Sequence, residues 1–306
     1  MPFQDRYLRQ AELLVRVLPY VAEEKCFALK GGTAINFFYR DMPRLSVDID
    51  LAYIPVAPRP ESLKAIDAAL MRIAGRIKAA IARASIQTSG TESTVTKLLI
   101  QSGNTQTKIE VTPVLRGSVY EPEVKSVSRS VEDRIGFAEM LVSSFPDLYG
   151  GKLVAALDRQ HPRDLFDVRD LFANEGITDD MRRAFIVYLI SHDRPMAEVL
   201  APTLLDIEPE FRTNFEGMTL GPVTLDELLA AREALVANIV GKMPRAHRKF
   251  LISFERGNAD WDLLGVPHAR DLPAVKWRQL NLDKTTEDKR AKLISQLEAV
   301  LGEQGT

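Results

Sequence analysis

Apolar residues follow a helical repeat at the start of the chain. Over residues 5–24 the repeat consists of Leu8, Leu13, Leu14, Val17, Leu18 and Val21. Positions three and four apart share one face of a helix, so this spacing predicts an amphipathic helix. A short apolar run at 26–29 then leads through Gly31, Gly32 and Thr33 into a second helical pattern at 34–39. The order predicts a strand, a glycine turn and a helix.

Residues 44–51 alternate between polar and apolar side chains. A period of two predicts a strand, with Asp48 and Asp50 on one face and Ile49 and Leu51 on the other. The alanine-rich segment 61–84 predicts a helix. Residues 93–101 and 106–115 predict two strands joined by a turn at 102–104, and Glu110 lies on the polar face of the second strand.

The strand signal nearly disappears after residue 130. The pattern predicts helices at 132–144, 147–159, 163–173, 178–191, 195–205, 224–241 and 285–301. We therefore expect an α/β domain over residues 1–125, followed by a mainly helical domain over residues 126–306.

Composition excludes several classes of protein. The chain has 306 residues, with 40 basic and 42 acidic side chains, so it is not a polycation that binds nucleic acid by bulk charge. Cys26 is the single cysteine, which excludes an intramolecular disulfide and a cysteine-rich zinc site. We find neither a signal-type apolar run nor a stretch of about 18 apolar residues, so we expect a cytoplasmic protein without a membrane span.

Three carboxylates suggest a site for chemistry. If the two strands that carry them are neighbours, Asp48, Asp50 and Glu110 can converge on one spot. Carboxylate oxygens suit Mg²⁺, and two cations about 3.5–4 Å apart suit in-line phosphoryl or nucleotidyl transfer. Each carboxylate alone is more typical of a solvated strand face, so it is the combination that indicates a metal site.

The segment Gly31, Gly32 and Thr33 fits the same chemistry. Glycines between a strand and a helix let the backbone approach a phosphate, and the start of a helix favours an anion. No Gly-Lys-Ser/Thr follows, so this is not a Walker A loop. Taken alone, such a segment is usually only a turn.

Three blocks of sequence carry a family resemblance. Residues 29–51 run LKGGTAINFFYRDMPRLSVDIDL, residues 149–159 run YGGKLVAALDR and residues 162–168 run PRDLFDV. With the weaker C-terminal stretch around 250–282, they resemble the AbiEii/AbiGii (MenT-like) nucleotidyltransferase toxins of type IV toxin–antitoxin systems. That family lies within the DNA polymerase β-like nucleotidyltransferase superfamily.

The resemblance implies a fold and an activity. The first domain would be a polymerase β-like nucleotidyltransferase domain with a mixed sheet, and the helical domain would complete the active-site cleft. The activity would be Mg²⁺-dependent, or Mn²⁺-dependent, transfer of a nucleoside monophosphate from an NTP to an acceptor hydroxyl. The acceptor implied is the 3′ end of tRNA, which would block translation, and a cognate antitoxin would be the partner. We take a monomer as the default.

The resemblance also implies roles for particular residues. Asp48, Asp50 and Glu110 would hold the metal ions, and Glu110 could assist deprotonation of the acceptor hydroxyl. The nucleotide phosphates would lie against Lys30, Gly31, Gly32, Thr33, Lys152 and Arg163. Asp164 or Asp167 would act on the acceptor hydroxyl or the base, and the sequence does not distinguish between them.

Other interpretations stay open at this point. Lys152 could extend along an apolar helix face, and Asp164 and Asp167 could be solvated at a helix start. The basic cluster Lys242, Arg245, Arg248 and Lys249 could contact RNA or be a solvated helix end.

The function has rivals as well. The same site could act as a kinase or an AMP-transferase on a protein side chain, or the chain could be an inactive regulatory binding module. A Mg²⁺-dependent nuclease could also use clustered carboxylates. We expect Trp261 and Trp277 to pack in the core or between helices.

Overall fold

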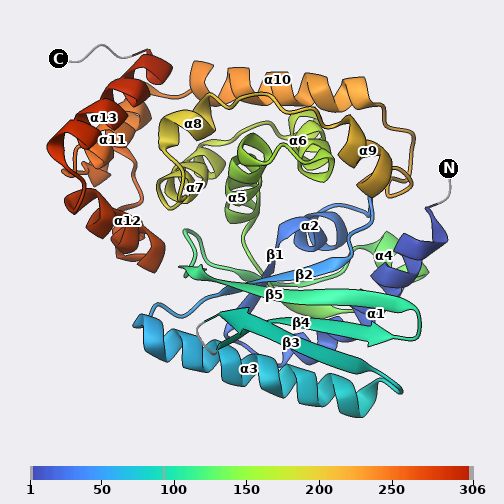
Figure 1. The fold of residues 1–306 in the computed structure, drawn as a ribbon. Coiled ribbons are helices and arrows are strands. Elements are labelled where there is room, and N and C mark those ends of the chain that lie inside the picture. Colours follow the sequence, from blue (N-terminus) through green and yellow to red (C-terminus); the bar gives the residue numbers. More distant parts are fainter. Residues whose placement is uncertain (1–2, 92–93, 303–306) are drawn as a thin grey trace. The chain divides into compact units, whose positions relative to one another are not determined.

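The computed structural model describes residues 3–91 and 94–302 and divides into two compact units. One unit comprises Met1–Leu148 and Phe215–Pro222, and the other comprises Tyr149–Asn214 and Val223–Thr306. Figure 1 shows a sheet in the first unit and helices in the second. The boundary that we expect between an α/β domain over residues 1–125 and a helical domain over residues 126–306 stays a prediction.

The first unit is built on a mixed sheet. Among the described residues, seven strands lie in the order β3-β4-β5-β2-β1-β7-β6. Their bounds are β1 (Phe27–Lys30), β2 (Asp48–Tyr53), β3 (Ser85–Thr91), β4 (Thr94–Ser102), β5 (Thr105–Arg116), β6 (Glu123–Ser126) and β7 (Glu139–Val142). The pairs β2–β5 and β1–β7 are parallel, and the other pairs are antiparallel. The predicted mixed sheet is confirmed.

Helices pack on this sheet through the apolar faces that the sequence predicts. The helices of the unit are α1 (Asp5–Ala22), α2 (Gly31–Ala34) with the π-helical turn η1 (Ile35–Tyr39), α3 (Arg59–Ala80) and α4 (Arg129–Arg134). Helix α3 lies against β4, and α1 lies against β5 and β7. Leu14 and Leu18 of α1 and Ile66 and Ile73 of α3 are fully buried. Burial of these side chains stabilises the layer by about 1.5–3 kcal/mol each.

Among its described residues, the second unit has helices as its only regular secondary structure. It contains most of α5 (Phe145–Asp158), together with α6 (Pro162–Asn174), α7 (Asp179–Ile190), α8 (Met196–Leu200), α9 (Glu208–Asn214), α10 (Leu225–Gly241), α11 (Arg245–Glu255), α12 (Pro273–Asp283) and α13 (Glu287–Leu301). Short 3₁₀ turns, η2 (Trp261–Leu263) and η3 (Pro267–Asp271), connect α11 to α12. Phe185, Phe250 and Phe254 are among its fully buried side chains. The predicted helical second half is thus confirmed.

Within the described ranges, every helix is too short or too polar to span a bilayer.

Two expectations about local structure are wrong. The helix predicted over 132–144 is only the short α4, and Met140 and Val142 lie instead in β7. That strand gains its partners from β1 and β6, which local periodicity cannot show. Trp261 packs against Phe250 with ring centroids 5.0 Å apart, whereas Trp277 is 58% exposed. Trp277 is exposed because α12 buries its neighbours Ala274 and Val275 instead.

Candidate active site

Two carboxylates lie side by side across neighbouring strands. Strands β2 and β5 run parallel, and their register pairs Asp50 with Glu110 and Asp48 with Lys108. Asp48 and Asp50 are two positions apart on β2, so their side chains share one face of the sheet. Ile49 and Leu51 point to the opposite face and are fully buried. The structure therefore places Asp48, Asp50 and Glu110 together on the more open face.

Glu110 is held by two lysines. The Lys108 Nζ lies 2.7 Å from Glu110 Oε2, and the Lys97 Nζ lies 3.3 Å from Glu110 Oε1. Burial alone raises the pKa of the Glu110 carboxyl, but the bonds from these lysines bring it below its ordinary value. Burial likewise opposes a charged Lys108, whereas Glu110, Asp48 and Asp50 together raise the pKa of its ammonium group.

These lysines are functional candidates that the sequence analysis missed. Lys108 lies on the polar face of its strand beside Glu110, but a lysine next to a glutamate reads as an ordinary surface pair. Lys97 comes from β4, and its register partner is Glu110. Lys97 and Glu110 lie on different strands, so their proximity does not show in the sequence spacing. A predicted register between the two strands could have revealed it.

The carboxylates suit a divalent cation by their chemistry. Asp48, Asp50 and Glu110 offer hard oxygen donors, which Mg²⁺ prefers. Across residues 3–91 and 94–302, however, no three His, Cys, Asp or Glu side chains are gathered closely enough to hold a metal as they stand. Asp48 and Asp50 fit the role directly, and Glu110 fits it once its bonds to the lysines are released.

The glycine segment packs against the same carboxylates. Gly31 has a φ of +73°, and a Cβ there would lie 2.7 Å from Asp50 Oδ2. A Cβ on Gly32 would lie 2.7 Å from Nη2 of Arg44, a buried cation that the sequence analysis did not single out. Glycine at both positions therefore allows the backbone to approach β2 and the Arg44 side chain closely.

Thr33 and Lys30 flank this segment. The buried Thr33 hydroxyl donates a hydrogen bond of 2.5 Å to the Asp48 carbonyl. The Ser46 Oγ lies 2.8 Å from the Thr33 Oγ1. This bond ties the start of α2 to the strand that carries Asp48. Lys30 is the register partner of Asp50 on β1, and its Nζ lies 3.5 Å from Thr112 Oγ1.

The close approach at Gly31 gives a testable prediction. We expect Gly31→Ala to reduce catalysis by on the order of 100-fold, because the new methyl group displaces Asp50 and strains a left-handed backbone. Gly103→Ala is the matched control, since Gly103 also has a positive φ, of +60°, but nothing within 4 Å of the added carbon. The measurement compares the steady-state rate of the reaction catalysed at this site in purified Gly31→Ala with that in purified Gly103→Ala. Equal rates would show that the contact with Asp50 has no role.

Lys152, Asp164 and Asp167 form a buried ion-pair cluster in the second unit. The Lys152 Nζ lies 2.7 Å from Asp164 Oδ1 and 3.0 Å from Asp167 Oδ2, and the lysine side chain is 6% exposed. The two aspartates lie three positions apart on α6, so they share one face of that helix. These burials and distances argue against a solvated helix start for the aspartates.

Asp164 has a second cationic partner. Arg159 Nε donates to Asp164 Oδ2 at 2.6 Å. Burial opposes ionisation of Asp164, but Lys152 and Arg159 together hold its pKa well below the usual range. A carboxylate in this environment is a weak base, so its chemistry suits the positioning of Lys152. Arg163, at the second position of α6, is half-buried, and its backbone N–H donates a hydrogen bond to Nδ1 of the N-cap residue His161.

His161 makes this helix start sensitive to pH. Its Nδ1 accepts a hydrogen bond from the Arg163 N–H, and burial, with nearby cations, lowers the pKa of the imidazole to about 4. The unfolded chain binds the proton near pH 6.5, so stability falls as the pH drops from 6.5 towards 4. We expect a loss on the order of 2 kcal/mol across this window. Denaturant unfolding measures it.

His161→Asn is the matched variant for this prediction. Asparagine caps a helix without titrating in this range, so the pH dependence between 6.5 and 4 is expected to flatten. An unchanged slope would assign the effect to another group.

The basic cluster divides into different environments. Lys242, Arg245 and Lys249 are exposed. Arg248 donates to the carbonyls of Met243 and Val240 at 3.0 and 2.8 Å and to the Leu301 carbonyl. Arg248 therefore caps the ends of α10 and α13. RNA contacts by this cluster stay a prediction.

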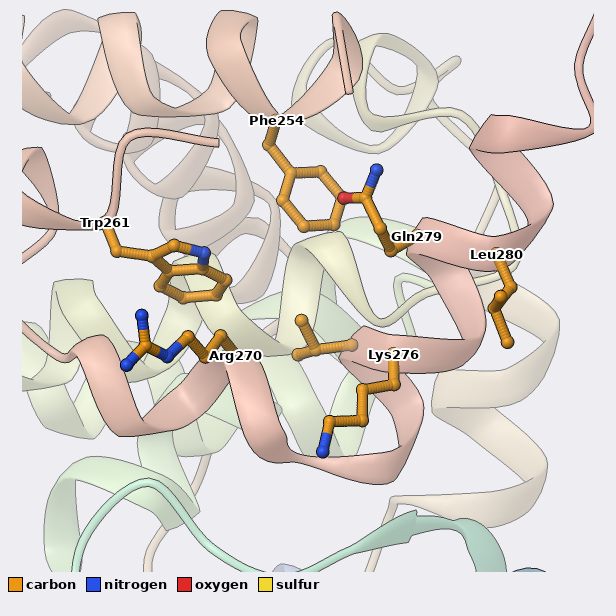
Figure 2. A pocket seen from close by; sticks show the side chains of 7 residues that line it. Phe254, Trp261, Arg270, Lys276, Gln279 and Leu280 are labelled. Carbon is orange, nitrogen blue, oxygen red and sulfur yellow. The ribbon is translucent and has the colours of Figure 1, made fainter. Parts of the chain in front are cut away.

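A cavity of about 330 Å³ lies elsewhere in the second unit. It is lined by Phe254, Trp261, Arg270, Val275, Lys276, Gln279 and Leu280. Figure 2 shows the rings of Phe254 and Trp261 turned toward this space. None of the candidate residues described above lines it.

Comparisons with known proteins place this geometry in context. The family profile described as nucleotidyl transferase AbiEii toxin, type IV TA system, matches residues 12–276. The nucleotidyltransferase toxin MenT4 from Mycobacterium tuberculosis H37Rv is similar in structure, with a TM-score of 0.61 and 15% identity over 90% of this chain and 93% of that one. JHP933 from Helicobacter pylori aligns with a TM-score of 0.45 and 16% identity, over 78% and 94% of the chains. No curated protein sequence matches the chain.

Proposed function

We propose, from the premise that this chain belongs to the AbiEii family of nucleotidyltransferase toxins of type IV toxin–antitoxin systems, that it transfers a nucleoside monophosphate to the 3′ end of tRNA. An NTP is the donor and pyrophosphate is released. A tRNA altered at its 3′ end is no longer a substrate for aminoacylation, so translation stops. The cognate antitoxin that the family implies would neutralise this activity.

One observation supports the chemistry most directly. Asp50 and Glu110 are register partners on parallel strands, Asp48 lies on the same face, and Gly31 approaches Asp50 without a side chain between them. Carboxylates beside a glycine segment at the start of a helix are suited to binding a nucleotide triphosphate together with a divalent cation.

Asp48, Asp50 and Glu110 would hold Mg²⁺, or Mn²⁺ in its place. The cation would polarise the α-phosphate and compensate the charge that develops on it during transfer. Gly31, Gly32 and Thr33 would place the β- and γ-phosphates, with Lys30 nearby. Most of the rate would come from positioning and electrostatic stabilisation, as in other phosphoryl transfers.

Lys152 would neutralise charge on the leaving pyrophosphate, and Arg163 would assist it. The carboxylates of Asp164 and Asp167 both form ion pairs with the Lys152 Nζ, which supports different roles for the aspartates and the lysine. We infer that Asp164 and Asp167 are positioning residues that hold Lys152. Asp164, whose pKa is held well below its usual range, is a poor candidate for deprotonation of the acceptor hydroxyl, and we propose Glu110 for that step.

A labelling assay tests this function. The purified protein is incubated with Mg²⁺, total tRNA and each α-labelled NTP in turn, beside a set labelled on the γ-phosphate. We expect α-label on tRNA, which also identifies the preferred nucleotide. Transfer of γ-label alone indicates a kinase, and α-label on protein indicates an AMP-transferase-like activity.

Two further outcomes separate the remaining alternatives. Cleavage of tRNA without any NTP would indicate a nuclease. No label in any lane would favour a regulatory binding module. Because NTP and tRNA are both cytoplasmic, we propose the cytoplasm as the site of action, with the monomer as the active form.

A further inference from the structure

Charged residues form a row across four strands of the sheet. In register, Lys97 of β4 pairs with Glu110 of β5, Glu110 pairs with Asp50 of β2, and Asp50 pairs with Lys30 of β1. Lys108 is the register partner of Asp48 in the next row. Each carboxylate of this face therefore has a lysine close by within the same unit.

Both oxygens of the Glu110 carboxylate already have a cationic partner. Lys108 Nζ is 2.7 Å from Oε2 and Lys97 Nζ is 3.3 Å from Oε1. A carboxylate that coordinates a metal needs its oxygen lone pairs for that ion, and two ammonium groups compete for them. A fixed positive charge a few ångströms away also repels a divalent cation.

We propose that Lys97 and Lys108 act as a latch on Glu110, which becomes a ligand of the divalent cation only when both ammonium groups release it. This inference rests on the proposed function, in which Asp48 and Asp50 hold the cation. The lysines are positioning residues, because they act on the site through Glu110. They set the cation concentration at which the third carboxylate joins the site.

The exposure of the pairs makes such a latch reversible. The side chains of Lys97, Lys108 and Glu110 are 38%, 30% and 35% exposed. Ion pairs that are open to solvent contribute little net free energy, so a divalent cation can displace them at modest cost. A fully buried pair, such as Lys152 with Asp164, would not open in this way.

Titration with Mn²⁺ alone tests the latch without any need for turnover. Free Mn²⁺ is followed by its electron paramagnetic resonance signal in the parent protein, in Lys108→Met and in Lys97→Met. We expect about ten-fold tighter binding for Lys108→Met and a smaller gain for Lys97→Met, whose pair is longer. Lys108→Gln, which also lacks the charge, replaces Lys108→Met should that variant not fold.

Two controls isolate the effect. Lys125→Met removes a lysine of β6 that pairs with Glu123 at 3.3 Å, and its Mn²⁺ affinity is expected to match that of the parent protein. In a Glu110→Gln background, Lys108→Met is expected to lose most of its gain, since the lysine acts through that carboxylate.

Two results overturn the latch. Unchanged or weaker Mn²⁺ binding by Lys108→Met, with tRNA labelling retained by the parent protein, removes the latch and leaves the proposed function standing. Weaker binding would mean that the lysines orient Glu110 for the metal. No Mn²⁺ binding by any of these proteins removes the latch together with the metal site of the proposed function.

Discussion

Replacing Asp48 by asparagine is expected to reduce nucleotidyl transfer by on the order of 10³-fold or more. The substitution removes a hard oxygen ligand and a full negative charge from the face where Asp50 and Glu110 also lie. The fold is expected to persist, because the Asp48 backbone carbonyl still accepts the Thr33 hydrogen bond. The measurement is the rate of α-label incorporation into tRNA at saturating NTP.

The control for this variant is an aspartate of the same unit outside the site. Asp133 on α4 is 67% exposed in its side chain and pairs only loosely with Arg129 at 3.7 Å. Asp133→Asn is therefore expected to keep the parent rate. Normal activity of Asp48→Asn would exclude a catalytic metal site on β2.

Replacing Lys152 by methionine is expected to destabilise the second unit by about 3–5 kcal/mol. The substitution leaves Asp167 without the ammonium group that lies 3.0 Å from its Oδ2, in a position where the aspartate is 1% exposed. Asp164 keeps its bonds to Arg159. Thermal unfolding followed by circular dichroism is expected to show a midpoint lower by about 10 °C.

The double variant Lys152→Met with Asp167→Asn separates stability from chemistry. Neutralising the Asp167 side chain is expected to recover most of the lost stability, because burying a neutral amide costs much less free energy than burying a carboxylate. Nucleotidyl transfer is expected to stay absent, because Lys152 is itself a proposed phosphate ligand. Recovery of full activity in the double variant would argue against that role.

The sequence was most informative where chemistry and periodicity coincide. Alternation over 44–51 predicted that Asp48 and Asp50 share a face, and the structure places them so on β2. The partnership of that strand with the one carrying Glu110 was only a condition in the sequence analysis. It became a fact through the parallel register of Asp50 and Glu110, which depends on the whole sheet.

Contacts between residues on different elements were the hardest part to predict. The approach of Lys97 to Glu110 follows only from the register of β4 and β5. Arg44 lies within the block at 29–51, but nothing in the local pattern indicates how closely its side chain lies to Gly32. Residues 139–142 form the strand β7 within a segment where the pattern predicts a helix, because a four-residue strand paired on both sides needs no local sequence signal. Pairing and burial of this kind arise from tertiary packing, which a single sequence does not report.

The positions of the tryptophans give the molecule a built-in spectroscopic asymmetry. The chain has two tryptophans, Trp261 on η2 and Trp277 on α12, and both belong to the helical unit. Tryptophan fluorescence excited at the red edge of the indole band therefore reports on the helical unit and gives no signal from the unit that contains the sheet. Far-ultraviolet dichroism sees the helices of both units. Denaturation curves recorded by the two signals will coincide if the units unfold together and separate if each melts alone.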